Sequence, residues 1–316
     1  MTNRTTSRVL AAATALLALG AVAGCSTGGA AGADPQRVDV VAAFYPLQFI
    51  AERVGGDAVH VTNLAKPGAE PHDLELSPRQ VGQVTEAELI VYLKGFQPAV
   101  DETVAQDDDA RVFDVAGVQP LLDASAGGHN HEGAEEQGEE QHAHAKDPHV
   151  WLDPTRLAAI GDQLAQRLGE VDADHAVDYT ARATALRADL TALDGEFTQG
   201  LATCQRREIV TSHTAFGYLA DRYRLEQVGI TGLSPDVEPS PQRLARVIED
   251  AKAHHATTIF FEALVSPKVA ETIAGQVGAK TAVLDPIEGL AAGSGSDYLS
   301  VMRTNLQTLR TALSCS

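Results

Sequence analysis

The chain has 316 residues, of which 44% are hydrophobic and 21% are charged. This balance is ordinary for a globular protein, and it excludes a chain that is disordered throughout and a polytopic membrane protein. Acidic residues outnumber basic ones by 43 to 24, so the formal net charge is -19. Because so acidic a surface repels phosphate backbones and attracts cations, we expect no nucleic-acid partner.

The N-terminus is typical of an exported lipoprotein. Two arginines precede an apolar run from Val9 to Gly24, which is shorter than a membrane-spanning helix requires. The run ends in Val22-Ala23-Gly24-Cys25, which resembles a bacterial lipobox. We therefore expect residues 1–24 to be a signal peptide, Cys25 to be lipidated and residues 25–36 to be a flexible tether outside the cytoplasmic membrane. A plain signal peptide is the alternative.

Residues 37–172 predict an N-terminal α/β lobe, because strand and helix patterns alternate there. A helix is expected from Pro46 to Val54, where Gly55-Gly56 ends it. Strands are expected at 38–45, 59–64 and 89–93.

An acidic, histidine-rich segment at 123–147 interrupts this lobe. It contains no aliphatic residue larger than Ala, so it cannot bury enough apolar surface to offset its ordering entropy. We expect a disordered insertion that serves as a weak accessory metal site; a charged run that only solvates is the alternative. The histidines of this segment are His129, His131, His142 and His144.

After a helix that ends near Leu168, apolar residues from Tyr179 to Leu201 recur every three, four or seven positions. This spacing predicts a long linking helix over 173–202, which is suited to join two lobes rigidly. Residues 203–316 then predict a C-terminal α/β lobe. Strands are expected at 208–211, 257–261 and 282–284, and helices at 213–223, 244–255, 267–277 and 296–313.

Cys204 and Cys315 lie near the two ends of the C-terminal lobe. In an oxidising compartment they are able to pair, and a disulfide would tie the C-terminus to that lobe. Two unpaired thiols are the alternative.

Four side chains suited to metal ligation lie in predicted loops, three of them after predicted strands and His149 after the insertion. Ligand sites in open α/β sheets collect beyond the carboxyl ends of strands, so a cleft between the lobes is able to gather all four. Three neutral imidazoles and one carboxylate satisfy tetrahedral Zn²⁺ and leave no open position, which suits capture rather than hydrolysis. The four residues are His72, His149, His213 and Asp285.

Several segments around these residues carry a family resemblance, in order from about residue 38 to 316. They are Phe44-Tyr45-Pro46-Leu47, Gly55-Gly56-Asp57, Pro67-Gly68-Ala69-Glu70-Pro71-His72-Asp73-Leu74-Glu75, Asp147-Pro148-His149-Val150-Trp151-Leu152-Asp153-Pro154, Thr211-Ser212-His213-Thr214-Ala215-Phe216-Gly217-Tyr218, Phe261-Glu262 and Leu284-Asp285-Pro286. The chain resembles the metal-binding solute-binding proteins of bacterial ABC transporters for zinc and manganese.

The resemblance implies two Rossmann-like α/β lobes joined by one long rigid helix, with the metal in the cleft between them. It assigns the metal to His72, His149, His213 and Asp285, and a histidine at the third position indicates zinc. It also implies delivery to an ABC permease by a monomeric, lipid-anchored protein that is not an enzyme. The insertion is a possible docking site for a metallochaperone.

Two acidic residues near the predicted ligands have less certain roles. Glu262 is expected either to contact a ligand from behind or to join the lobes, and Glu70 is an alternative oxygen donor to Asp285. The segment Lys94-Gly95-Phe96-Gln97-Pro98 departs from the family pattern, so its contact to the site stays open.

Two other functions were weighed. A manganese- or iron-binding member of the same family is the first alternative, and His213 argues against it. An exported zinc hydrolase is the second; it requires an open coordination position, and the sequence lacks a His-Glu-x-x-His motif.

Overall fold

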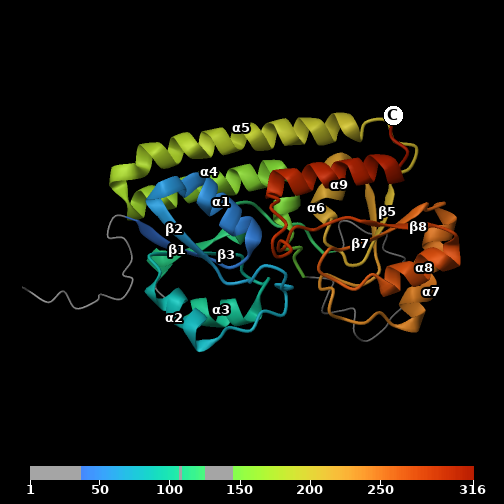
Figure 1. Ribbon diagram of the computed structural model, residues 1–316, viewed down its shortest axis with the longest axis horizontal. Helices are drawn as coiled ribbons and strands as arrows, with labels where there is room; N and C mark the ends of the chain where they lie inside the picture. The colour runs from blue at the N-terminus through green and yellow to red at the C-terminus, as the bar shows by residue number, and fades with distance from the viewer. Residues whose placement is uncertain (1–36, 107–108, 125–144) are drawn as a thin grey trace, which may run out of the picture. The chain divides into compact units, whose positions relative to one another are not determined.

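The computed structural model describes residues 37–106, 109–124 and 145–316 (Figure 1). The predicted signal peptide, lipidation site at Cys25 and tether, and the four histidines of the insertion, lie outside the described residues. Within the described residues, no helix combines the length and apolar character needed to cross a membrane.

The N-terminal half is built on a four-stranded parallel sheet with the strand order β2-β1-β3-β4. The apolar runs predicted as strands form its centre; β3 is buried at every residue, as expected for a parallel strand covered on both faces. The strands are β1 (Val38–Ala42), β2 (Val59–Asn63), β3 (Leu89–Tyr92) and β4 (Val112–Asp114). The helices of this half are α1 (Tyr45–Gly55), α2 (Pro78–Glu86), α3 (Pro98–Val104) and α4 (Pro154–Val171).

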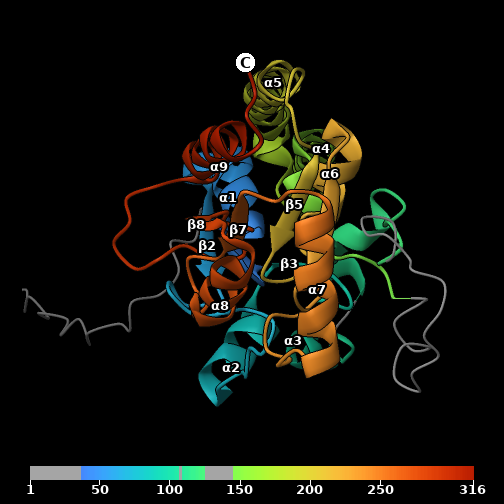
Figure 2. The same ribbon diagram turned by 90° about the vertical axis from the view of Figure 1, so that its right-hand side faces the viewer.

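The C-terminal half repeats this topology with the strand order β6-β5-β7-β8, also parallel. A separate cluster of buried apolar side chains lies between this sheet and α7 and α8, which stand in front of it in Figure 2. The strands are β5 (Glu208–Thr211), β6 (Glu226–Gly229), β7 (Thr258–Phe261) and β8 (Lys280–Val283). The helices are α6 (Gly217–Tyr223), α7 (Pro241–Ala253), α8 (Lys268–Val277) and α9 (Tyr298–Ala312).

The predicted linking helix is α5 (Ala176–Gly200), whose 25 residues give a length of about 38 Å at 1.5 Å per residue. It packs against α1, α4 and α9 and runs along both halves (Figure 1). Its apolar stripe is buried from Tyr179 to Phe197. The two α/β halves with one long helix across them confirm the predicted fold class, whereas the exact domain boundaries stay predictions.

Four elements escaped the sequence analysis. The strand β4 has only three residues, and only one of the four residues of β6 is aliphatic, so neither gives a clear apolar pattern. The helix α2 had a usable signal, because Ser77 and Gln80 form a reciprocal capping box ahead of its first turn. The helix α3 is a short segment of seven residues that begins at Pro98.

The predicted disulfide between Cys204 and Cys315 is confirmed. It joins the segment before β5 to the end of the chain, where the two cysteines also form an isolated antiparallel bridge.

The ends of the acidic insertion are pinned together. Asp123 and Lys146 form an antiparallel bridge, and the ammonium of Lys146 lies 2.6 Å from the carboxylate of Asp123. The Ala124 N–H donates to the Ala145 carbonyl at 2.9 Å, and the Asp147 N–H donates to the Leu122 carbonyl at 2.9 Å. The chain therefore enters and leaves the insertion at a fixed point, directly before the segment that carries His149.

Candidate metal centre

His213 is placed by the carboxyl end of β5. Its backbone carbonyl accepts hydrogen bonds from the Thr211 hydroxyl at 2.7 Å and from the side-chain amide of Gln227 at 3.1 Å. Its ring Nδ1 lies 2.6 Å from a carboxylate oxygen of Glu262, which directly follows β7 and also accepts from the Ser212 hydroxyl. Because the carboxylate accepts a hydrogen bond from Nδ1–H, Nε2 of the ring is left to face the site.

His149 is oriented by a neighbour two residues earlier in the chain. One carboxylate oxygen of Asp147 accepts from the His149 backbone N–H at 2.9 Å and lies 2.8 Å from the ring Nδ1. The backbone carbonyl of Asp147 accepts from the Tyr218 hydroxyl at 2.9 Å, which connects this segment to α6 of the C-terminal half. His149 is fully buried, with an exposed fraction of 0%.

His72 lies in a loop beyond β2 that is held from two sides. The carboxylate of Glu70 accepts from the His72 backbone N–H at 3.1 Å, and the side-chain amide of Gln97 donates to the Pro71 carbonyl at 3.1 Å. The Phe96 ring meets the imidazole edge-on, with centroids 4.6 Å apart. The segment whose role the sequence left open thus supports His72 through Phe96 and Gln97.

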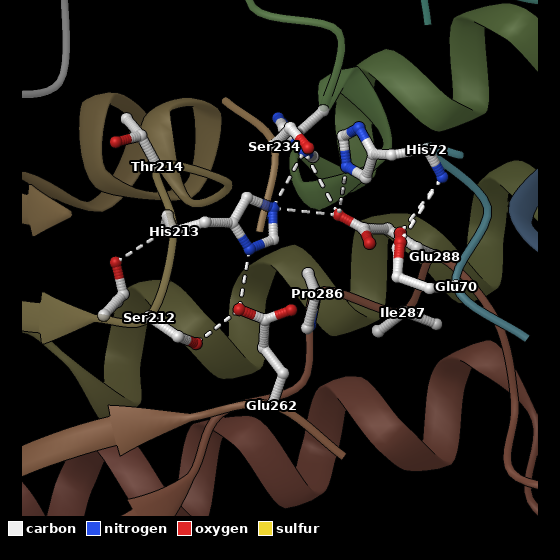
Figure 3. Close-up of polar contacts among 12 residues, drawn as sticks. Glu70, His72, Ser212, His213, Thr214, Ser234, Glu262, Pro286, Ile287 and Glu288 are labelled. Carbon is white, nitrogen blue, oxygen red and sulfur yellow. Dashed lines mark hydrogen bonds and ion pairs between the residues drawn. The ribbon is translucent and has the colours of Figure 1, made fainter. Parts of the chain in front are cut away.

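The three imidazoles meet at one carboxylate, that of Glu288, in the loop after β8. Figure 3 shows the rings of His72 and His213 beside this carboxylate. Its Oε1 lies 3.3 Å from Nε2 of His72, 3.2 Å from Nε2 of His149 and 3.1 Å from Nε2 of His213. Nε2 of His149 and Nε2 of His213 are 3.3 Å apart, and all four ligand atoms lie within 4.8 Å of one another.

These separations match the edges of a small coordination tetrahedron. Zn²⁺ binds imidazole nitrogens at about 2.0–2.1 Å, which gives edges of about 3.3 Å in a regular tetrahedron. The side chains of His149, His213 and Glu288 are at most 4% exposed, and that of His72 is 8% exposed. A cation at the centre of the group would therefore exchange its water for three nitrogens and one oxygen.

The carboxylate that lies among the three imidazoles belongs to Glu288 and not to the predicted Asp285. Asp285 lies outside the four-residue group, because one of its carboxylate oxygens accepts the Ile287 N–H at 2.8 Å. The backbone turn at Ile287 points the side chain of the next residue, Glu288, toward the imidazoles (Figure 3). The sequence analysis missed Glu288, although it lies in the same loop after β8 as Asp285.

The charges of the group support one another. Burial alone would lower the pKa of His213, but the carboxylates of Glu288 and Glu262 raise it to about 10. Burial likewise opposes the charged form of His149, yet its hydrogen bonds to Asp147 and Glu288 raise its pKa. Burial lowers the pKa of His72. Burial would raise the pKa of Glu288, but the neighbouring imidazoles hold it well below its usual value.

The two other acidic candidates lie beside the group. Glu70, Glu262 and Asp285 line a small pocket next to Glu288. Burial and the charge of Glu288 raise the pKa of Glu70 to about 8, and burial raises the pKa of Asp285 to about 6. Glu262 contacts His213 and Ser212, both of its own half, so its position matches the expected contact behind a ligand. The pocket brings additional carboxylates to the edge of the site.

Comparison with known proteins gives a consistent family. The family model described as "Zinc-uptake complex component A periplasmic", ZnuA, matches residues 40–312. The high-affinity zinc uptake system protein ZnuA of Bacillus subtilis is 34% identical over 314 residues, and the match covers 95% of each chain. The zinc-binding protein AdcA of Streptococcus pyogenes serotype M3 is 35% identical over 286 residues, which is 87% of this chain.

The streptococcal relatives are longer proteins, because the matched region is 56% of that AdcA. A relative from Streptococcus pneumoniae, 35% identical over 281 residues, is named a zinc-binding lipoprotein; the match covers 87% of this chain and 55% of the relative. Among solved structures, the Zn(II)-bound ZnuA-like domain of Streptococcus pneumoniae AdcA has a TM-score of 0.72 and 32% identity. That match covers 88% of this chain and 99% of the domain.

Proposed function

The chain belongs to the ZnuA family of zinc-uptake components, and from that premise we propose that it captures Zn²⁺ outside the cytoplasmic membrane and delivers it to an ABC permease. The ion is the transported cargo. The ligands in this proposal are His72, His149, His213 and Glu288, with the last in place of Asp285.

The observation that carries the proposal is the convergence of three Nε2 atoms on one carboxylate oxygen at 3.1–3.3 Å. Three imidazoles with one carboxylate fill a tetrahedral shell, so no position is left for a reactive water. Such a closed site binds and releases an ion but does not activate water, and we therefore propose a binding protein rather than an enzyme.

The donor set also favours zinc over manganese or iron. Imidazole-rich sites suit Zn²⁺, whereas Mn²⁺ prefers carboxylate and water oxygens. The third imidazole, from His213, is the residue that decides this preference. Replacing it by a carboxylate would move the site toward manganese.

The remaining parts of the proposal concern place and partners. Lipid at Cys25 would anchor a monomer to the membrane close to its permease, and the lipoprotein name of the pneumococcal relative supports this anchor. The histidines of the insertion would hold further ions weakly and would offer a docking site for a metallochaperone. A tethered segment of this kind raises the local concentration of ions near the cleft.

The deciding experiment is a competitive titration of residues 26–316 with Zn²⁺ and Mn²⁺ against a chelator of known affinity. One tight Zn²⁺ equivalent that Mn²⁺ does not displace at similar concentration is expected. Preference for Mn²⁺ would support the manganese alternative, and the absence of any tight site would overturn the proposal. Replacing residues 125–144 by a short Gly/Ser linker should remove only additional weak equivalents.

Zinc affinity should rise with pH. Imidazole nitrogens bind the metal only when they are deprotonated, so each proton on the site competes with Zn²⁺. Because the neighbouring carboxylates raise the pKa of His213 to about 10 and also raise that of His149, we expect the affinity to fall already between about pH 10 and pH 7 and to keep falling below about pH 6. An affinity that is constant from pH 8 to pH 5 would exclude a three-histidine site.

A further inference from the structure

The loop that carries Glu288 has an unusual backbone. Ile287, the residue before it, has a φ of 60° although it is β-branched and fully buried. In this left-handed region a β-branched side chain clashes with its own backbone, so few such residues adopt it. A strained conformation of this kind persists where its surroundings over-determine it, and such residues cluster at functional sites.

Hydrogen bonds hold the backbone from Asp285 to Ile287 in place. Asn305 of α9 accepts from the Asp285 N–H at 3.0 Å and donates to the Asp285 carbonyl at 2.7 Å. The indole N–H of Trp151, from the segment of His149, donates to the Pro286 carbonyl at 2.7 Å. The carboxylate of Asp285 closes the turn by accepting the Ile287 N–H at 2.8 Å.

From these contacts, and on the basis of the proposed zinc-binding function, we propose that Asp285 is a positioning residue for Glu288. Its carboxylate holds the Ile287 backbone in the turn that directs the Glu288 carboxylate to the three imidazoles. Asp285 acts through a hydrogen bond to the backbone and does not contact the ion. Asparagine offers the same acceptor oxygen, so the proposal requires an oxygen at this position and not a charge.

The matched variants Asp285→Ala and Asp285→Asn separate these roles. Both remove the negative charge, and only the asparagine retains an acceptor for the Ile287 N–H. Outer-shell substitutions at metal sites typically cost about 10–100-fold in affinity, and we expect a loss of this size for Asp285→Ala. Asp285→Asn should recover most of the affinity. Equal losses of zinc affinity in the two variants would overturn the proposal. They would indicate that Asp285 binds the ion directly or acts through its negative charge.

A double-mutant cycle with Glu288→Ala tests whether Asp285 works through Glu288. If it does, adding Asp285→Ala to Glu288→Ala should change the Zn²⁺ affinity by less than about threefold, because non-additivity marks residues that act as a unit. A further loss as large as that of Asp285→Ala alone would show an independent effect and contradict the proposal.

A measurement without metal distinguishes this inference from the proposed function. Amide hydrogen exchange at Ile287 should be slow in the wild type and in Asp285→Asn, and at least about tenfold faster in Asp285→Ala. Thermal melts of the metal-free variants report whether the fold is intact. If the wild type lacks a tight zinc site but shows this exchange pattern, the proposed zinc-binding function is wrong, whereas the role of Asp285 in holding the turn is supported. Unchanged exchange in Asp285→Ala would overturn the positioning role regardless of metal binding.

Discussion

The two halves share one strand order, yet they support their histidines differently. In the C-terminal half His213 lies just beyond β5 and Glu262 just beyond β7, so neighbouring strand ends of one sheet set both residues. In the N-terminal half His72 and His149 lie on long connections, and side chains close to them in sequence, Glu70 and Asp147, hold their backbones. The sheet therefore places one half of the site, and local hydrogen bonds place the other.

The largest effect should come from removing an imidazole. Apparent zinc-binding free energies of about 10–16 kcal/mol shared among four ligands imply that His213→Ala and His72→Ala each weaken binding by about 100–1,000-fold. The competitive titration measures this, with the exposed His60→Ala as the matched control. A much smaller loss for His72→Ala would show that the N-terminal half contributes less than its geometry indicates.

The second effect concerns a covalent link that only the C-terminal half has. The disulfide spans a sequence separation of 111 residues. Replacing Cys204 and Cys315 by serine should lower the free energy of unfolding by about 2–4 kcal/mol, measured with denaturant. The zinc affinity should change less than about threefold, because the disulfide precedes β5 whereas His213 follows it. A large loss of zinc affinity would mean that the position of His213 depends on the disulfide at the end of the chain.

The third prediction compares the two carboxylates behind the imidazoles. Asp147→Ala should weaken zinc binding near the upper end of the range of about 10–100-fold, because Asp147 holds both the ring and the backbone of His149. Glu262→Ala should lie near the lower end, because Thr211 and Gln227 still fix the His213 backbone. The reverse order of losses would overturn the contrast drawn between the two halves.

The smallest effect concerns a contact that joins the halves. Arg222 of α6 donates to Asp194 of α5 at 2.5 Å and lies 3.4 Å from Asp153, which caps α4. The bond to Arg222 lowers the pKa of Asp194, so its stabilisation is present above the unfolded pKa of about 3.9 and is lost as pH falls through the folded value. Asp194→Asn should cost about 1 kcal/mol at pH 7 and less at pH 3, in matched thermal melts. An equal loss of stability at both pH values would mean that the negative charge of Asp194 does not stabilise the fold.

The three histidines could be singled out because each lies in a distinctive segment, with His213 just after β5 and His149 just after the acidic insertion. The carboxylate could not, since Asp285 and Glu288 lie in one loop and the choice depends on a backbone turn at Ile287. Isoleucine has no propensity for that turn, which hydrogen bonds with Trp151, Asn305 and the Asp285 carboxylate hold in place. The sequence pattern predicted the long α5 well, but it missed β6, where tertiary pairing with β5 outweighs a weak local signal.

The hydrogen-bonded ends of the acidic insertion determine how a change in its length would act on the rest of the chain. The bridge of Asp123 with Lys146 and the bond of Ala124 to Ala145 close the connection before it reaches His149. Loop-closure entropy rises by only about 0.6 kcal/mol for each doubling of the chain length between two joined ends, so a longer or shorter segment between Ala124 and Ala145 would cost little. A histidine added to or removed from residues 125–144 should therefore leave His149 in its place, because the bridge lies between the two.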